Sequence, residues 1–190
     1  MTRSPGARAV MYAAGGDGSP PRRSPGMNSH LERYWPLPLR ILLGIAFMVH
    51  GFPKLFSAEG HAQFQGMLGQ LGVPLPALMS WVVGLVEFFG GIALVVGLAT
   101  WLVTALLTID MLVAMFLVHL PHGFGFLQIT GTTAQGPVFG MPGIEVNLLY
   151  IAGLLALFIG GAGPLSVDER VMKPESRLQV PWLRHREAHA

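Results

Sequence analysis

The sequence predicts an all-α integral membrane protein, built as a bundle of four transmembrane helices with both termini in the cytoplasm. Of its 190 residues, 52% are hydrophobic and only 12% are charged, whereas soluble domains carry roughly 25% charged residues. Four apolar segments reach or approach the ~20 residues that cross a ~30 Å hydrocarbon core as a helix. They lie at about 36–56, 76–99, 101–120 and 144–161. A buried core in a soluble protein is the alternative, and too little polar sequence remains to cover one.

Three regions are expected along the chain. Residues 1–30 are rich in Gly, Pro, Ser, Ala and Arg and hold no sustained apolar run, which is typical of a disordered tail and unlike a signal peptide. Residues 31–168 form the membrane domain, and 169–190 form a basic cytoplasmic tail. A tighter start opens at Met27, so a further hypothesis is that translation begins there.

The distribution of basic residues predicts the orientation. Of the twelve Lys and Arg residues, six stand before or at the entry of the first segment and five follow the fourth. Only Lys54 lies between them, and the loop 121–143 contains none. Because cytoplasmic loops carry the excess of Lys and Arg, both termini are predicted to be cytoplasmic.

The two outer loops carry patterns of their own. In "AQFQGMLGQLGV", apolar residues at i, i+3, i+4 and i+7 predict a short helix lying in the membrane interface. These residues are Phe64, Met67, Leu68 and Leu71. The loop 121–143 is apolar and Gly-rich, and we expect it to cap the mouth of the bundle.

Small residues at four-residue spacing mark faces on which membrane helices approach closely. Two stripes fit: Ser80, Gly84 and Gly91 around Glu87 on the second segment, and Ala152, Ala156 and Gly160 on the fourth. Glu87 is therefore predicted to face inward.

Glu87 and His119 are the candidate catalytic residues. A charge near the bilayer centre costs at least ~2.5 kcal/mol, so an intramembrane carboxylate is a functional candidate. The alternative for Glu87 is a structural carboxyl that joins helices. His119 ends the third segment, where the helix dipole alone favours it.

Further polar residues are candidates for binding a substrate. They are Arg40, His50, Lys54, Glu145 and Asn147, most of them predicted in the outer half of the bundle. Arg40 and Lys54 have an alternative as snorkelling anchors, and Glu145 as a helix-dipole partner. His122 is a weaker loop candidate.

Asp110 is nine residues from His119, about half a turn out of phase in an undistorted helix. We therefore expect Asp110 to face a neighbouring subunit, which raises a homodimer as a hypothesis.

Several chemistries find no support. The chain has no cysteine, so thiolate metal sites and disulfide exchange are excluded for its own residues. No tight metal-ligand spacing is found and no metal is predicted, although a haem between His50 and His119 stays an alternative. Neither a dinucleotide fingerprint nor a phosphate-binding loop nor a basic nucleic-acid face is found.

Four segments together resemble one family. "LRILLGIAFMVHGFPKLF", "LGVPLPALMSWVVGLVEFFGGIALVVGL", "DMLVAMFLVHLPHGF" and "GIEVNLLYIAGLLALFIGGAGPLSVDE" resemble, in order, the four segments of the DoxX family over about residues 35–170. The resemblance implies a small four-helix bacterial inner-membrane protein, with relatives that include the membrane subunit of a thiosulfate:quinone oxidoreductase. The positions it carries over are Arg40, Lys54, Glu87, His119 and Glu145.

The leading functional hypothesis is a membrane subunit of a quinone-linked oxidoreductase or of a redox-stress complex. It expects no covalently bound cofactor, a quinone as ligand, and a peripheral redox enzyme as partner. Glu87 and His119 would relay protons, while Arg40 or Lys54 would stabilise a developing anion. Two alternatives stay open: a small proton-coupled transporter that uses Glu87, and a scaffold for a peripheral enzyme without chemistry of its own.

Overall fold

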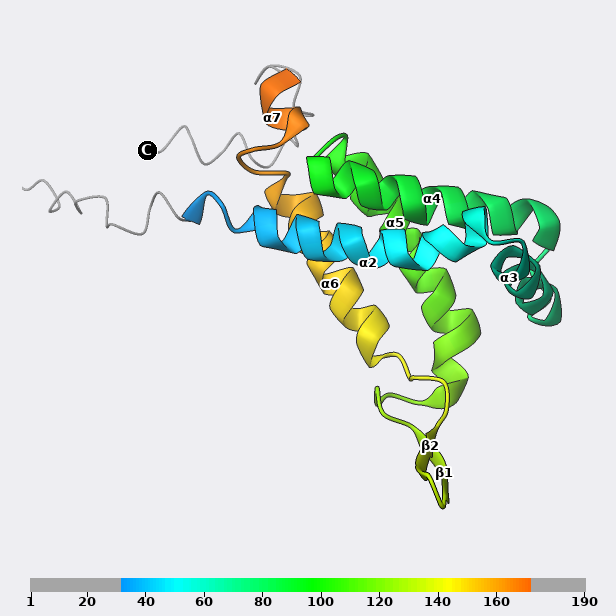
Figure 1. The fold of residues 1–190 in the computed structure, drawn as a ribbon. Helices are drawn as coiled ribbons and strands as arrows, with labels where there is room; N and C mark the ends of the chain where they lie inside the picture. The colour runs from blue at the N-terminus through cyan, green and yellow to red at the C-terminus, as the bar shows by residue number, and fades with distance from the viewer. Residues whose placement is uncertain (1–31, 172–190) are drawn as a thin grey trace, which may run out of the picture.

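The computed structural model describes residues 32–171, which are mostly helical (Figure 1). Its helices are α2 (Pro36–Phe56), α3 (Ala58–Gln70), α4 (Pro76–Val96), α5 (Thr100–Ala114), the π-helix η1 (Met115–His119), the 3₁₀ helix η2 (Leu120–His122), α6 (Glu145–Gly160) and α7 (Val167–Val171). The expected tail 1–30, with Met27, and residues 172–190 of the basic tail lie outside the described residues.

The helices form two antiparallel pairs. α2 lies beside α4, and α5 lies beside α6, with the second pair crossing the first at an angle (Figure 1). The pairs meet around a core to which α2, α4, α5 and α6 all contribute. Its buried members are Leu43, Phe47, Leu94, Leu107, Leu154 and Leu157. The pairs separate toward the end that carries α3 and the loop after α5.

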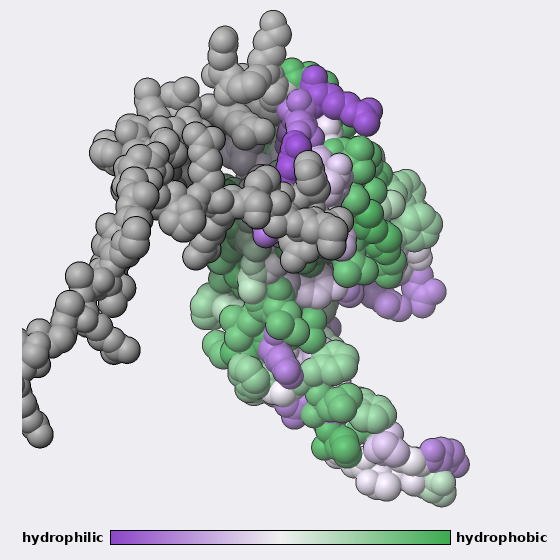
Figure 2. Space-filling model, turned by 90° about the vertical axis from the view of Figure 1, so that its left-hand side faces the viewer, coloured by the Kyte–Doolittle hydropathy of each residue, from purple (hydrophilic) through white to green (hydrophobic). Residues whose placement is uncertain are grey.

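Within residues 32–171, three helices are long and apolar enough to span a membrane: Pro36–Phe56, Pro76–Val96 and the continuous Thr100–His122. α6 is a shorter apolar helix of 16 residues. Figure 2 shows apolar side chains over the flanks of the helices and hydrophilic ones at the top, at the level of α7, with further hydrophilic residues at the right-hand edge and at the bottom tip. This surface suits a lipid environment, and the four-span count stays a prediction.

Glycine decides how closely α2 and α4 pack. A Cβ atom at Gly44 would lie 2.6 Å from the carbonyl oxygen of Gly91, too close without a shift of backbone. The predicted inward face of α4 is confirmed, because its buried residues include Ser80, Gly84, Glu87 and Gly91. Small residues thus let two membrane helices meet backbone to backbone.

The predicted small-residue face of α6 is wrong. α6 instead buries Asn147, Ile151, Leu154 and Leu157, and Ala152 is exposed. The reason is the kind of packing: α6 fills the shared core with branched aliphatic side chains, so that face needs volume and not close approach.

Buried hydrogen bonds tie the α4–α5 turn to the segment after α6. Arg40 is only 1% exposed and donates to the carbonyl oxygens of Leu94, Val95, Ala162 and Leu165. The Asp168 carboxylate accepts from the backbone N–H groups of Ala99 (2.7 Å) and Thr100 (2.8 Å) at the start of α5. These hydrogen bonds satisfy backbone carbonyl and N–H groups that helix ends leave unpaired. They therefore hold α2, the α4–α5 turn and the segment after α6 together at this end of the bundle.

The loop after α5 departs from the all-α expectation. It contains the antiparallel strands β1 (Ile129–Thr133) and β2 (Gly136–Phe139), which project away from the helices (Figure 1). The connection is a two-residue turn between Thr133 and Gly136, and Gly136 has φ 122°. β-branched residues and a tight Gly turn favour a hairpin. Its lack of an apolar–polar alternation hid these strands in the sequence.

Gly44→Ala is expected to destabilise the protein by about 2 kcal/mol, because the added methyl group forces α2 and α4 apart. Gly66→Ala is the matched control: a Cβ atom there meets nothing within 4 Å, and alanine favours the helix by about 0.5–1 kcal/mol. Unfolding in detergent, followed by circular dichroism, measures both. Equal effects of the two substitutions would contradict the close packing.

Arg40→Lys is expected to cost about 2–4 kcal/mol, since an ammonium cannot serve four carbonyl oxygens held by a planar guanidinium. Arg33→Lys is the control, because Arg33 makes an exposed ion pair with Glu169 at 3.5 Å and such pairs contribute little. The same unfolding assay applies. If Arg40→Lys lowers the free energy of unfolding no more than Arg33→Lys does, the hydrogen bonds of Arg40 do not stabilise this end of the bundle.

Candidate functional site

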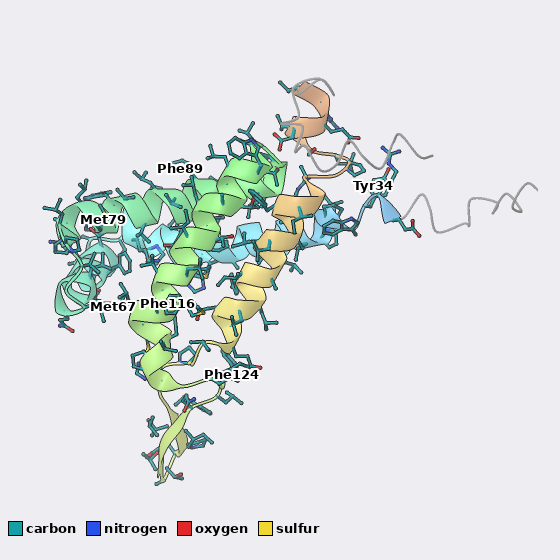
Figure 3. All side chains as sticks on the ribbon, turned by 180° about the vertical axis from the view of Figure 1, so that it is seen from behind. Tyr34, Met67, Met79, Phe89, Phe116 and Phe124 are labelled. Carbon is teal, nitrogen blue, oxygen red and sulfur yellow. The ribbon has the colours of Figure 1, made fainter. Side chains whose placement is uncertain are left out.

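A pocket of about 530 Å³ lies between the two helix pairs, at the end away from Arg40. Figure 3 shows the arrangement from behind, with α5 and α6 crossing the α2–α4 pair and with Met67 and Phe116 labelled on α3 and η1. Polar residues from five elements line the pocket: His50, Lys54, Glu87, Asp110, His119, Asn147 and Tyr150. The apolar face expected on the first outer loop belongs to α3 and the residue that caps its C-terminus, and it lines this pocket with Phe64, Met67, Leu68 and Leu71.

The centre of the site is an ion pair between Lys54 of α2 and Glu87 of α4. The side chains are 15% and 6% exposed, respectively. The Lys54 ammonium also lies 4.5 Å from the ring centroid of Phe64, a cation–π contact. Gly84 permits this meeting, because a Cβ atom there would lie 3.2 Å from Cβ of Lys54. The buried charge of Glu87 thus has a partner.

The structure places Asp110 in the pocket, contrary to the prediction that it faces a neighbouring subunit. It lines the pocket and is close enough to interact electrostatically with Glu87 and Lys54, so it does not face outward toward a neighbouring subunit. The expected half-turn offset between Asp110 and His119 is changed by η1, a π-helical segment at Met115–His119. Such a segment inserts about one extra residue into the helix, which turns His119 toward the side of Asp110.

His119 is held by the loop that returns to α6. Its Nδ1 lies 2.8 Å from the carbonyl oxygen of Pro142. Because a carbonyl only accepts, Nδ1 must carry the proton of this hydrogen bond. In the neutral ring, Nε2 is then a free acceptor.

Two buried oxygens at the site lack a donor. Asn147 is 4% exposed, and neither its Oδ1 nor Oδ2 of Asp110 has a hydrogen-bond partner among the described residues. Buried polar atoms are nearly always hydrogen-bonded. Unpaired ones in the wall of a pocket therefore point to a ligand.

Two predicted site residues lie elsewhere. Arg40 is 14 residues before Lys54 on α2, about 21 Å along the helix axis, and its guanidinium is occupied by four carbonyl oxygens. Glu145 accepts a hydrogen bond from the backbone N–H of Phe126 at 2.9 Å. It fixes the loop after η2, whose Phe126, Met141 and Pro142 line the pocket.

Sequence reasoning also missed what holds α3 over the pocket. His61 Nδ1 lies 2.7 Å from the Lys54 carbonyl oxygen, and His61 Nε2 lies 3.2 Å from Oγ of the buried Ser80. One ring thus connects α3 to α2 and α4. The signal was weak, because a single histidine in a polar loop has many ordinary explanations.

In the part of the chain that the structure describes, no three His, Cys, Asp or Glu side chains gather closely enough to hold a metal ion. The chemistry that the site offers is proton exchange and charge stabilisation. Its groups are two carboxylates, one ammonium and the imidazoles of His50 and His119.

Apolar helices around a charged pocket define a multi-pass membrane protein. The chain belongs to the DoxX family, whose model matches residues 35–120. It is 38% identical over 135 residues to "Putative oxidoreductase CatD" of Bacillus subtilis, covering 71% of this chain and 85% of that protein. Two similar proteins of Escherichia coli are inner membrane protein YqjF (31% identical; 75% and 96% covered) and inner membrane protein YphA (29%; 69% and 86%). No solved structure matches the chain. The protein is thus a multi-pass inner-membrane protein.

Lys54→Met is expected to destabilise the protein more than Glu87→Gln. The first substitution leaves two buried carboxylates without a cation, whereas the second leaves Lys54 with Asp110 nearby. Removing one partner of a buried pair costs about 3–5 kcal/mol, so Lys54→Met should lie in that range.

The double variant Lys54→Met/Glu87→Gln supplies the control. If the two groups interact, its loss of stability is smaller than the sum of the single losses. Thermal unfolding in detergent gives all three values. Additive losses would show that the ion pair does not form.

Proposed function

We propose that the protein is the membrane subunit of a quinone-linked oxidoreductase and that the pocket binds the quinone head group. The observation that carries this proposal is the gathering of proton-exchanging groups and one ammonium in an apolar pocket at membrane depth. Ligand sites are mostly apolar cavities of about 300–1,000 Å³ with a few convergent polar groups. Similarity to a protein named as an oxidoreductase supports the same reading.

The residues suit the chemistry of a quinone. Its two-electron reduction takes up two protons, and Glu87 and His119 are the groups that exchange protons with the head group. Lys54 stabilises the negative charge that develops on a quinone oxygen. The apolar residues of α3 accommodate the tail. Since the chain has no cysteine, any thiol in the electron path belongs to a peripheral redox enzyme, which is the partner that this proposal requires.

The proposal includes a topology of four spans with both termini in the cytoplasm. α6 is about 24 Å long at 1.5 Å per residue, somewhat short for the hydrocarbon core, and a helix of this kind is accommodated by local thinning of the bilayer or by snorkelling of its flanking residues. The pocket then opens in the outer half. With Asp110 facing the pocket, the sequence-based reason for a homodimer no longer holds.

One observation favours a second candidate, a proton-coupled transporter for a cationic substrate. Glu87 and Asp110 place two carboxylates against one ammonium, and such a pocket attracts cations when Asp110 is ionised. Proton-driven uptake of a hydrophobic cation into proteoliposomes, abolished by Asp110→Asn, would support this candidate over the quinone site.

The quinone proposal is tested by titrating the purified protein, in lipid nanodiscs, with a short-chain benzoquinone and its quinol. We expect saturable binding that Glu87→Gln weakens by about tenfold or more, the loss that follows when a hydrogen bond to a charged group is removed. Glu59→Gln is the matched control, because Glu59 is an exposed carboxylate of α3 that accepts from Gln63 at 3.0 Å. Absence of saturable binding of either form would remove the proposal.

A further inference from the structure

We infer that the pocket selects the oxidation state of its ligand and binds the reduced, hydroxyl-bearing quinol in preference to the quinone. This inference rests on the proposed function and deepens it. Two features of the site carry it: the hydrogen bond that fixes the tautomer of His119, and the two buried oxygens that lack a donor.

His119 supplies the first acceptor. Its Nδ1 donates to the carbonyl oxygen of Pro142 at 2.8 Å, so Nε2 of the neutral ring is an unprotonated acceptor on a residue that lines the pocket. His119 cannot turn its Nδ1–H group toward a ligand without breaking the hydrogen bond to the carbonyl oxygen of Pro142. The neutral ring therefore accepts a hydrogen bond from a ligand hydroxyl, and Nε2 can donate to a ligand carbonyl only after the ring has taken up a proton.

Other residues that line the pocket add further acceptors. Glu87 and Asp110 are carboxylates, and when ionised they only accept. Oδ2 of Asp110 and Oδ1 of Asn147 are both buried and without a donor among residues 32–171. On the donor side, the ammonium of Lys54 is paired with Glu87 and lies near the ring of Phe64. The hydroxyl of Tyr150 and the amide of Asn147 belong to residues that also line the pocket.

The two oxidation states of the ligand differ in this property. A quinol brings two hydroxyl donors, one for His119 Nε2 and one for the group of Asp110 and Asn147. A quinone brings two carbonyl acceptors, which would face acceptors of the protein and leave buried groups unpaired. A site built for a hydroxyl discriminates strongly against an analogue that lacks it, for this reason.

A consequence concerns the direction of the reaction. A site that binds the reduced form more tightly also favours reduction of a bound quinone by the same factor, because binding and redox equilibria are linked. The pocket is thereby suited to receive electrons from the partner enzyme and to stabilise the quinol that the reduction forms. The class of reaction that supplies this site is the oxidation of a two-electron donor.

The test compares affinities for a short-chain benzoquinone and the corresponding quinol. The full-length protein in nanodiscs is dialysed to equilibrium under anaerobic conditions, with the quinol kept reduced. We expect the quinol to bind about tenfold more tightly or better, as one or two hydrogen bonds to charged or buried acceptors imply.

Two variants test whether His119 and Asp110 cause the preference for the quinol. His119→Asn keeps an amide donor near Nδ1 for Pro142 but removes the acceptor at Nε2, and Asp110→Asn replaces an acceptor with a donor. Each variant should reduce the ratio of quinol affinity to quinone affinity to within about threefold, mainly because it weakens the binding of the quinol. Glu59→Gln should leave the ratio unchanged. Unfolding temperatures of all variants, measured in the same nanodiscs, confirm that they are folded.

The outcomes separate the two proposals. Equal affinities, or tighter binding of the quinone, would overturn the selectivity while leaving a quinone site in place. A preference for quinol that survives both His119→Asn and Asp110→Asn would overturn the assignment to these residues. If neither form binds saturably, the proposed function itself fails, and the selectivity falls with it.

Discussion

The meeting of Lys54 and Glu87 is the interaction on which the rest of the molecule depends. A carboxylate in the middle of an apolar helix is costly in lipid, and a second helix must deliver a cation to it at the right depth. Ser80, Gly84 and Gly91 keep the facing surface of α4 small, so α2 comes close enough for its ammonium to arrive. The packing of these two helices and the electrostatics of the pocket are therefore one constraint.

The two ends of the bundle are built on opposite principles. At one end, Arg40 and Asp168 saturate backbone groups with charge-assisted hydrogen bonds, and the helices are fixed there. At the other end, the pairs separate and polar side chains face a cavity with bonds left unmade. Rigid support at a distance from the pocket lets the site retain unpaired acceptors, since stability comes from elsewhere in the fold.

Composition and periodicity predicted much of this architecture. The inward face of α4 and the apolar face of α3 follow from residue spacing, because a straight helix repeats every 3.6 residues. The grouping of His50, Lys54, His119 and Asn147 was expected from their depth along helices whose direction the basic residues predict. The wrong predictions arise where the helical repeat does not determine which way a residue faces. Asp110 was placed outward because η1 cannot be seen in the sequence, and the buried face of α6 was misjudged because small and large residues alternate around it. Arg40 shows a further limit of prediction from sequence. Residue spacing indicated the face of the helix on which Arg40 lies, but it could not identify the carbonyl oxygens to which Arg40 donates.

The π-helical segment has a consequence for how the sequence can change over time. Since η1 holds one residue more than a regular turn requires, loss of a single residue from Met115–His119 would restore an ordinary helix. Everything downstream would then rotate by about a quarter of a turn or more, which carries His119 away from Asp110 while the hydropathy profile stays almost the same. Descendants of this chain can therefore keep every feature of a membrane protein and still lose the pocket through one deleted codon.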